Sequence, residues 1–105
     1  MTTVKFIYCN NLMQGFTVKG HSTINENDEL GRLVCTAISS ATYLTCNTLT
    51  DVLFLKCDIK ENDGFLSCKV LENLDTAQIT LKGFKLHMEG LKEQYKSHLN
   101  LMEEK

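Results

Sequence analysis

The sequence predicts an α+β fold with two layers, in which two helices pack on a four-stranded sheet in the order ββαββα. Three observations support this prediction. Two pairs of short apolar stretches, one near the N-terminus and one past the middle, are each typical of a β-hairpin. Two other stretches repeat apolar residues every three or four positions, as amphipathic helices do. The length of 105 residues fits one core, so we expect a single domain over residues 1–105.

The first hairpin is expected at the N-terminus. Alternation over residues 4–9 places Val4 and Phe6 on one face of a strand. Asn10 and Asn11 form a turn signal, and residues 13–21 return as the second strand.

The first helix is expected to begin near Asp28, because Asn27 or Asp28 can cap it. Several threonines between residues 45 and 50 weaken helix propensity and mark its end. Its apolar stripe comprises Leu30, Val34, Ile38 and Ala41, with Leu33, Ala37 and Leu44 beside them.

Residues 51–59 and 65–71 read as the second pair of strands, joined by a hairpin turn over residues 60–64. Asp75 and Gln78 resemble a capping box that starts the last helix. The apolar stripe of that helix comprises Leu81, Phe84, Met88, Leu91, Tyr95, Leu99 and Met102, with His87 and His98 as exposed flank residues. Residues 103–105 are then a frayed tail.

The charge and hydropathy of the sequence argue against two classes of binding partner, nucleic acids and membranes. The net charge of −2 argues against a broad basic face, so we expect no direct nucleic-acid partner. No apolar run approaches the roughly 20 residues of a membrane span, and there is no signal-peptide pattern, so we expect a cytoplasmic protein without a membrane partner.

The cysteines predict neither a disulfide framework nor a metal site. Their number is five, which is odd, and no CxxC pair occurs, so we expect no metal and no cofactor. Four of them are expected to be small buried hydrophobic residues: Cys9, Cys46, Cys57 and Cys68.

Cys35 differs because of its neighbours. A thiol needs a base or a positive charge nearby to act as a nucleophile, and His21 stands at the other end of one polar loop. On a helix that begins near Asp28, Gly31, Cys35 and Ser39 stack along one line. Gly31 removes side-chain bulk, and Ser39 can orient a reacting group.

These residues resemble the signature of the bacterial ribosomal-processing cysteine proteases. The matching residues are Gly20-His21, a polar loop, Gly31, Val34-Cys35 and Ala37-Ile38-Ser39. The resemblance implies a thiol protease with Cys35 as nucleophile, His21 as general base and Ser39 as a supporting residue. It further implies a homodimer, a mobile loop over the peptide, and a substrate in ribosome biogenesis, namely the N-terminal extension of a large-subunit ribosomal protein.

Arg32 departs from the family pattern. The family usually has aspartate three residues before the cysteine, and its glycine stands one residue farther from the cysteine than Gly31 does. A guanidinium at position 32 favours a thiolate but opposes an imidazolium nearby. Asp28 or Glu29 can take over the task of the missing carboxylate.

Two functions therefore stay open. One is the peptidase, and the other is an altered family member that binds a ribosomal protein without cutting it. A thiol-redox role ranks third, because no other cysteine lies near Cys35 in the sequence.

Overall fold

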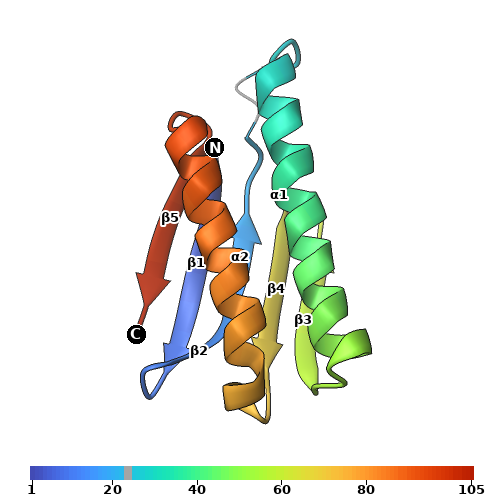
Figure 1. Ribbon diagram of the computed structural model, residues 1–105. Helices are drawn as coiled ribbons and strands as arrows, with labels where there is room; N and C mark the ends of the chain where they lie inside the picture. Colours follow the sequence, from blue (N-terminus) through green and yellow to red (C-terminus); the bar gives the residue numbers. More distant parts are fainter. Residues whose placement is uncertain (23–24) are drawn as a thin grey trace.

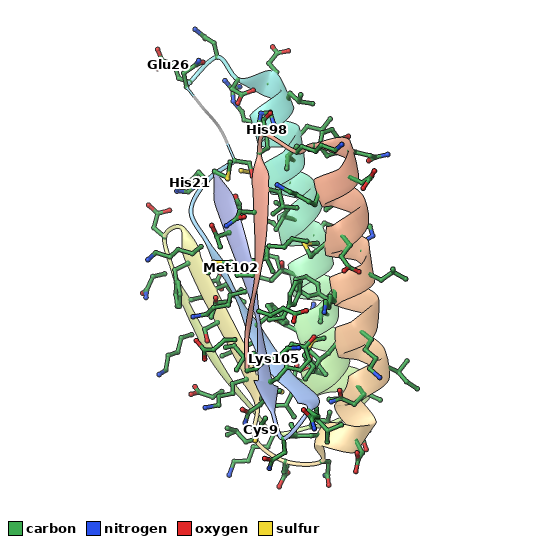
Figure 2. The ribbon with its side chains drawn as sticks, turned by 90° about the vertical axis from the view of Figure 1, so that its left-hand side faces the viewer. Cys9, His21, Glu26, His98, Met102 and Lys105 are labelled. Atoms are coloured by element: carbon green, nitrogen blue, oxygen red, sulfur yellow. The ribbon has the colours of Figure 1, made fainter. Side chains whose placement is uncertain are left out.

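The computed structural model, which describes residues 1–22 and 25–105, has two layers: a sheet, and two helices that cover one of its faces (Figures 1 and 2). The elements in chain order are β1 (Thr2–Cys9), β2 (Leu12–Lys19), α1 (Glu29–Asn47), the π-helical turn η1 (Thr48–Val52), β3 (Cys57–Asn62), β4 (Phe65–Val70), α2 (Leu74–Gln94) and β5 (Leu99–Glu104). The α+β class, the two hairpins and the two helices are as predicted.

The sheet is mixed and has five strands in the order β3-β4-β2-β1-β5. Strand β5 runs parallel to β1, whereas all other neighbours are antiparallel. The prediction of four strands in the order ββαββα is therefore wrong by one strand at the C-terminal end.

The last helix stops at Gln94, so the prediction that it runs to Met102 is wrong, and residues 103–105 are not simply a frayed tail. Leu99 and Met102, three positions apart, fit a helical spacing, whereas Leu99 and Leu101 alternate as strand residues do. Pairing with β1 turns Leu99 into the core, whereas Met102 lies half exposed. Because β1 has a free edge on that side, residues 99–104 pair with it as a strand and do not continue the helix.

The second hairpin also differs from its prediction. The π-helical turn η1 occupies the start of the predicted strand 51–59, and β3 begins only at Cys57. Strand β3 then continues to Asn62, which pairs with Phe65, so the turn is shorter than the predicted residues 60–64. Gly64 has φ +72°, which a glycine adopts without strain.

Asp28 caps α1 as predicted, because its side chain accepts a hydrogen bond from Gly31 N–H at 2.9 Å. The capping box of Asp75 and Gln78 does not form. Gln78 instead holds α2 on the sheet, since its amide bonds both the N–H (2.9 Å) and the carbonyl oxygen (2.8 Å) of Met13. The Gln78 side chain therefore bonds the buried start of β2, and it does not cap the start of α2 as predicted.

The core lies between the sheet and the helices, and the predicted stripe of α2 supplies Leu81, Phe84, Met88 and Leu91 to it. The stripe of α1 is only half right. Its buried side includes Val34, Ile38 and two threonines, Thr42 and Thr45, whereas Leu30, Leu33 and Leu44 are exposed. The threonines fit the interior because their hydroxyls donate to the carbonyl oxygens of Ile38 and Ala41 within the helix.

No helix within residues 1–22 and 25–105 combines the length and the apolar character needed to cross a membrane.

Two glycines give a matched test of the packing. Gly15 lies next to the bulge in β2, where the pairing with β1 skips one residue, and a Cβ there would overlap the main-chain carbonyl oxygen of Cys68 on β4. Gly83 on α2 has open space around it. In urea unfolding, Gly15→Ala should lower the free energy of unfolding by about 2 kcal/mol, and Gly83→Ala should raise it by about 1 kcal/mol. Equal effects would contradict the register of β2 and β4.

Candidate active site

A cleft of about 170 Å³ opens between α1 and the ends of β2, β3 and β4. We call it the Cys35 cleft, and its lining includes Gly20, His21, Cys35, Ser39, Tyr43 and Glu61. Four of the six site residues that the sequence predicts thus share one cavity. Gly31 and Arg32 lie outside its lining.

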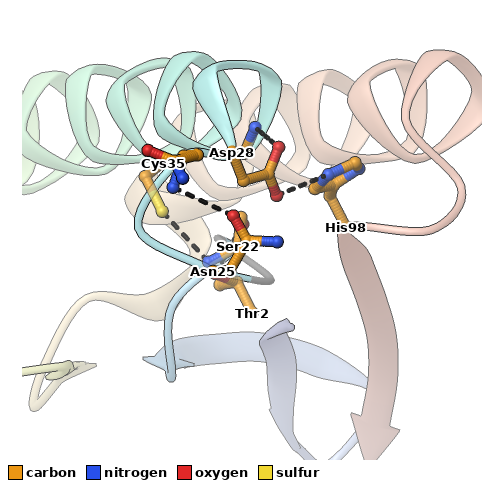
Figure 3. Close-up of polar contacts among 8 residues, drawn as sticks. Thr2, Ser22, Asn25, Asp28, Cys35 and His98 are labelled. Atoms are coloured by element: carbon orange, nitrogen blue, oxygen red, sulfur yellow. Dashed lines mark hydrogen bonds and ion pairs between the residues drawn. The ribbon is translucent and has the colours of Figure 1, made fainter.

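Cys35 is half-buried in the second turn of α1, facing the junction that follows β2. The main-chain N–H of Ser22 donates a hydrogen bond to Cys35 Sγ at 3.0 Å (Figure 3). A main-chain donor aimed at the sulfur stabilises negative charge there. Ser39 follows one helical turn later on the same side of α1.

His21 is carried by the opposite wall of the cleft. Its imidazole lies against Gly64, where an added Cβ would be 3.0 Å from His21 Nε2. Gly20 N–H donates to the Gly64 carbonyl oxygen at 2.8 Å and so ties the end of β2 to the turn between β3 and β4. Gly20 has φ +95°, and a Cβ there would approach the main-chain oxygen of Met1 to 2.6 Å, so both glycines are required by the backbone.

Within the described part of the chain, no hydrogen bond joins the side chains of His21 and Cys35. The two residues nevertheless face the same cavity, because one lies at the end of β2 and the other on α1 above it. Contacts between catalytic groups often tighten only when substrate is bound.

Four further contacts brace Cys35, and we call them the Thr2–His98 network; Figure 3 shows the two that involve the Asp28 carboxylate. The Ser22 hydroxyl bonds the Thr2 hydroxyl at 2.7 Å, and Thr2 N–H donates to the His98 carbonyl oxygen at 3.2 Å. His98 Nε2 lies 3.2 Å from Asp28 Oδ2, and Asp28 caps the helix that carries Cys35. The start of β1 and the turn before β5 therefore both support the thiol.

The prediction that His98 is an exposed helix residue is wrong, because only 8% of its surface is accessible. Parallel pairing of β5 with β1 brings His98 to the same end of the sheet as His21 and the start of α1 (Figure 2). His87 is exposed on α2, as predicted.

The other two predicted site residues lie at the start of α1. Gly31 is buried, and its N–H donates to Asp28, so it serves the helix cap rather than the cleft. Arg32 is exposed, and its Nη2 donates to the main-chain carbonyl oxygen of Glu26. The predicted lid over residues 22–27 includes Thr23 and Ile24, which lie outside the described residues.

The remaining thiols are only partly as predicted. Cys46 and Cys68 are buried and Cys57 is half-buried, but Cys9 is exposed because it ends β1 on the face away from the helices. A hydrogen bond with Cys46, together with burial, raises the pKa of Cys68, and burial raises the pKa of Cys57. Among residues 1–22 and 25–105, no group of three histidine, cysteine or acidic side chains is arranged to hold a metal ion.

The family model described as "Cysteine protease Prp" matches residues 1–100. The chain belongs to the Prp family. This confirms the resemblance inferred from the residues around His21 and Cys35. A comparison with curated proteins found no match.

Solved structures of similar fold include the essential ribosomal processing protease Prp from S. aureus in complex with a covalently linked product peptide. It shares 21% identity with this chain at a TM-score of 0.85, covering 99% of this chain and 100% of that one. The protein SMU.848 from Streptococcus mutans shares 18% identity at a TM-score of 0.78, covering 99% and 96%. At these identities the likeness to the Prp structures shows the fold alone.

We expect Cys35 to be the most reactive of the five thiols. Cys68 and Cys57 have raised pKa values, and Cys46, whose pKa is lowered by its hydrogen bond with Cys68, is buried away from the reagent, whereas Cys35 accepts a main-chain N–H and lines an open cleft. Brief iodoacetamide labelling followed by peptide mass mapping should modify Cys35 first. The exposed Cys9 is the internal control, and faster labelling there would contradict an activated Cys35.

His98→Ala should lower the free energy of unfolding by about 2 kcal/mol, because it removes a nearly buried partner of the charged Asp28. The control is His87→Ala on the exposed face of α2, which should change it by less than about 0.5 kcal/mol. Urea unfolding at pH 7 measures both. Equal values would mean that the Thr2–His98 network does not brace α1.

Proposed function

We propose that this protein is a cysteine endopeptidase that removes the N-terminal extension of a large-subunit ribosomal protein. The observation that carries the proposal is the Cys35 cleft itself, in which a thiol with a main-chain donor and a histidine line opposite walls in a chain of the Prp family. The S. aureus relative, which is named as a ribosomal processing protease, holds a covalently linked product peptide.

In the proposed mechanism, His21 takes the proton of the Cys35 thiol, and the thiolate attacks the carbonyl carbon of the scissile peptide. The tetrahedral intermediate collapses when protonated His21 gives its proton to the leaving amine, which leaves a thioester on Cys35. His21 then takes a proton from water, the hydroxide attacks the thioester, and the extension leaves as a carboxylic acid. The Ser22 N–H favours the thiolate before attack.

Ser39 and Gly20 have supporting roles in this proposal. Ser39 lies one turn beyond Cys35 and can donate its hydroxyl to the bound peptide. Gly20, with φ +95°, lets the chain turn at the end of β2 so that His21 reaches the cleft. We further propose a cytoplasmic homodimer, as the resemblance to the family implies.

The alternative is a binding module without catalysis, and Arg32 in place of the usual aspartate favours it. The position of the guanidinium supports the enzyme instead. Arg32 is held on the main chain of Glu26 and is not part of the cleft lining, so its charge lies outside the cleft that His21 lines. Asp28 is paired with His98, which leaves it to brace the helix.

The direct test is incubation with the extended ribosomal protein, followed by mass measurement of the shortened product. The wild type should cut, and Cys35→Ala and His21→Ala should each lower the rate at least about 1,000-fold. Ser39→Ala should cost less, about tenfold, because it removes one hydrogen bond. Equal cutting by wild type and Cys35→Ala would contradict the proposal.

Arg32→Asp restores the usual family residue and separates the two candidate functions. If the protein is an enzyme, the substitution should preserve or raise the cleavage rate, since the wild-type guanidinium does not line the cleft. If neither protein cuts while both bind the extension tightly, the binding module is the correct function.

A further inference from the structure

The Cys35 cleft continues well past the proposed nucleophile. Along α1 its wall runs from Cys35 through Ser39 to Tyr43, which are spaced four residues apart and so lie on one side of the helix. On the sheet side the wall runs from His21 and Gly64 to Glu61 on β3. The far end of the cleft has no part in the peptide-bond chemistry proposed above.

Glu61 is unusual for its place in the sheet. Cys57, Ile59 and Glu61 alternate along β3 and share the face that turns toward the helices. Glu61 pairs with the buried Leu66. The alternation of Cys57 and Ile59 predicts an apolar side chain at this position, but the residue is a carboxylate. Among the described residues that line the cleft there is no lysine, arginine or aspartate, and Glu61 is the only carboxylate.

Tyr43 holds this carboxylate across the cleft. Its hydroxyl donates to Glu61 Oε2, and this hydrogen bond raises the pKa of Tyr43, so the tyrosine stays a neutral donor at neutral pH. Only one oxygen of Glu61 is used in this contact, and a carboxylate can accept several hydrogen bonds.

We propose that this end of the cleft, formed by Tyr43 and Glu61, is a subsite for a lysine or arginine side chain of the bound peptide. The proposal rests on the peptidase function above and adds a preference for charge. The cationic group would bond Glu61 Oε1, and its aliphatic stem would lie along the ring of Tyr43.

Helix geometry gives the position of this side chain in the substrate. Tyr43 follows Cys35 by eight residues, which is about 12 Å along α1 at roughly 1.5 Å per residue. An extended peptide covers that length in about three or four residues. The subsite therefore takes a side chain three or four residues away from the scissile bond.

The test is a binding scan that does not depend on cleavage. Cys35→Ala protein is titrated into fluorescein-labelled twelve-residue peptides that span the junction between extension and mature protein, with lysine or its uncharged analogue norleucine at each position in turn. Lysine should bind about tenfold more tightly than norleucine at one position, three or four residues from the junction.

In a background of Glu61→Gln, which keeps an acceptor for Tyr43, this lysine preference should disappear. With Glu61→Lys, glutamate should replace lysine as the preferred residue at that position. Glu93→Gln on the exposed end of α2 is the matched control and should leave the preference unchanged. A flat scan, or a preference that survives Glu61→Gln, overturns the subsite.

The two proposals fail in different ways. If the wild type cuts the extended protein but the scan is flat, the peptidase stands and the subsite is wrong. If nothing is cut but lysine preference follows Glu61, the subsite stands as part of a binding module.

Discussion

The hydrogen bond from the Ser22 main chain to Cys35 Sγ is the contact on which the site depends, because it joins the end of β2 to the helix that carries the thiol. That contact is braced in turn by Thr2, in the first strand, and by His98, in the turn that precedes the last strand. The thiol is thus positioned by segments from both ends of the chain. Parallel pairing of β1 with β5 is the part of the fold that brings those ends together.

The two layers have different tasks around the cleft. The close-packed apolar core between the sheet and the two helices holds α1 in place on the sheet. The polar end of the sheet then supplies His21 and Glu61, while α1 supplies Cys35, Ser39 and Tyr43 at a spacing of four. A regular helix packed on the sheet is enough to place the proposed nucleophile, base and charged subsite around one cleft.

Local patterns predicted much of this arrangement, and the errors have a common cause. The two hairpins, the cap at Asp28 and the inner stripe of α2 follow from short-range spacing, which the sequence shows directly. The fifth strand and the buried His98 depend on a partner almost a hundred residues away in the chain, and the same spacing fits a helix equally well. Glu61 carried a local signal, since it breaks an alternating pattern, but its partner Tyr43 becomes visible only in the fold.

The most direct measurement of the central claim is covalent trapping with the extension peptide bearing a C-terminal chloromethyl ketone. The thiolate displaces chloride and forms a thioether, so intact mass and peptide mapping report where and how fast the reagent reacts. The account predicts a single adduct per chain, on Cys35, with a rate that falls at least about tenfold in His21→Ala. Adducts mainly on the exposed Cys9, or equal rates with and without His21, would contradict it.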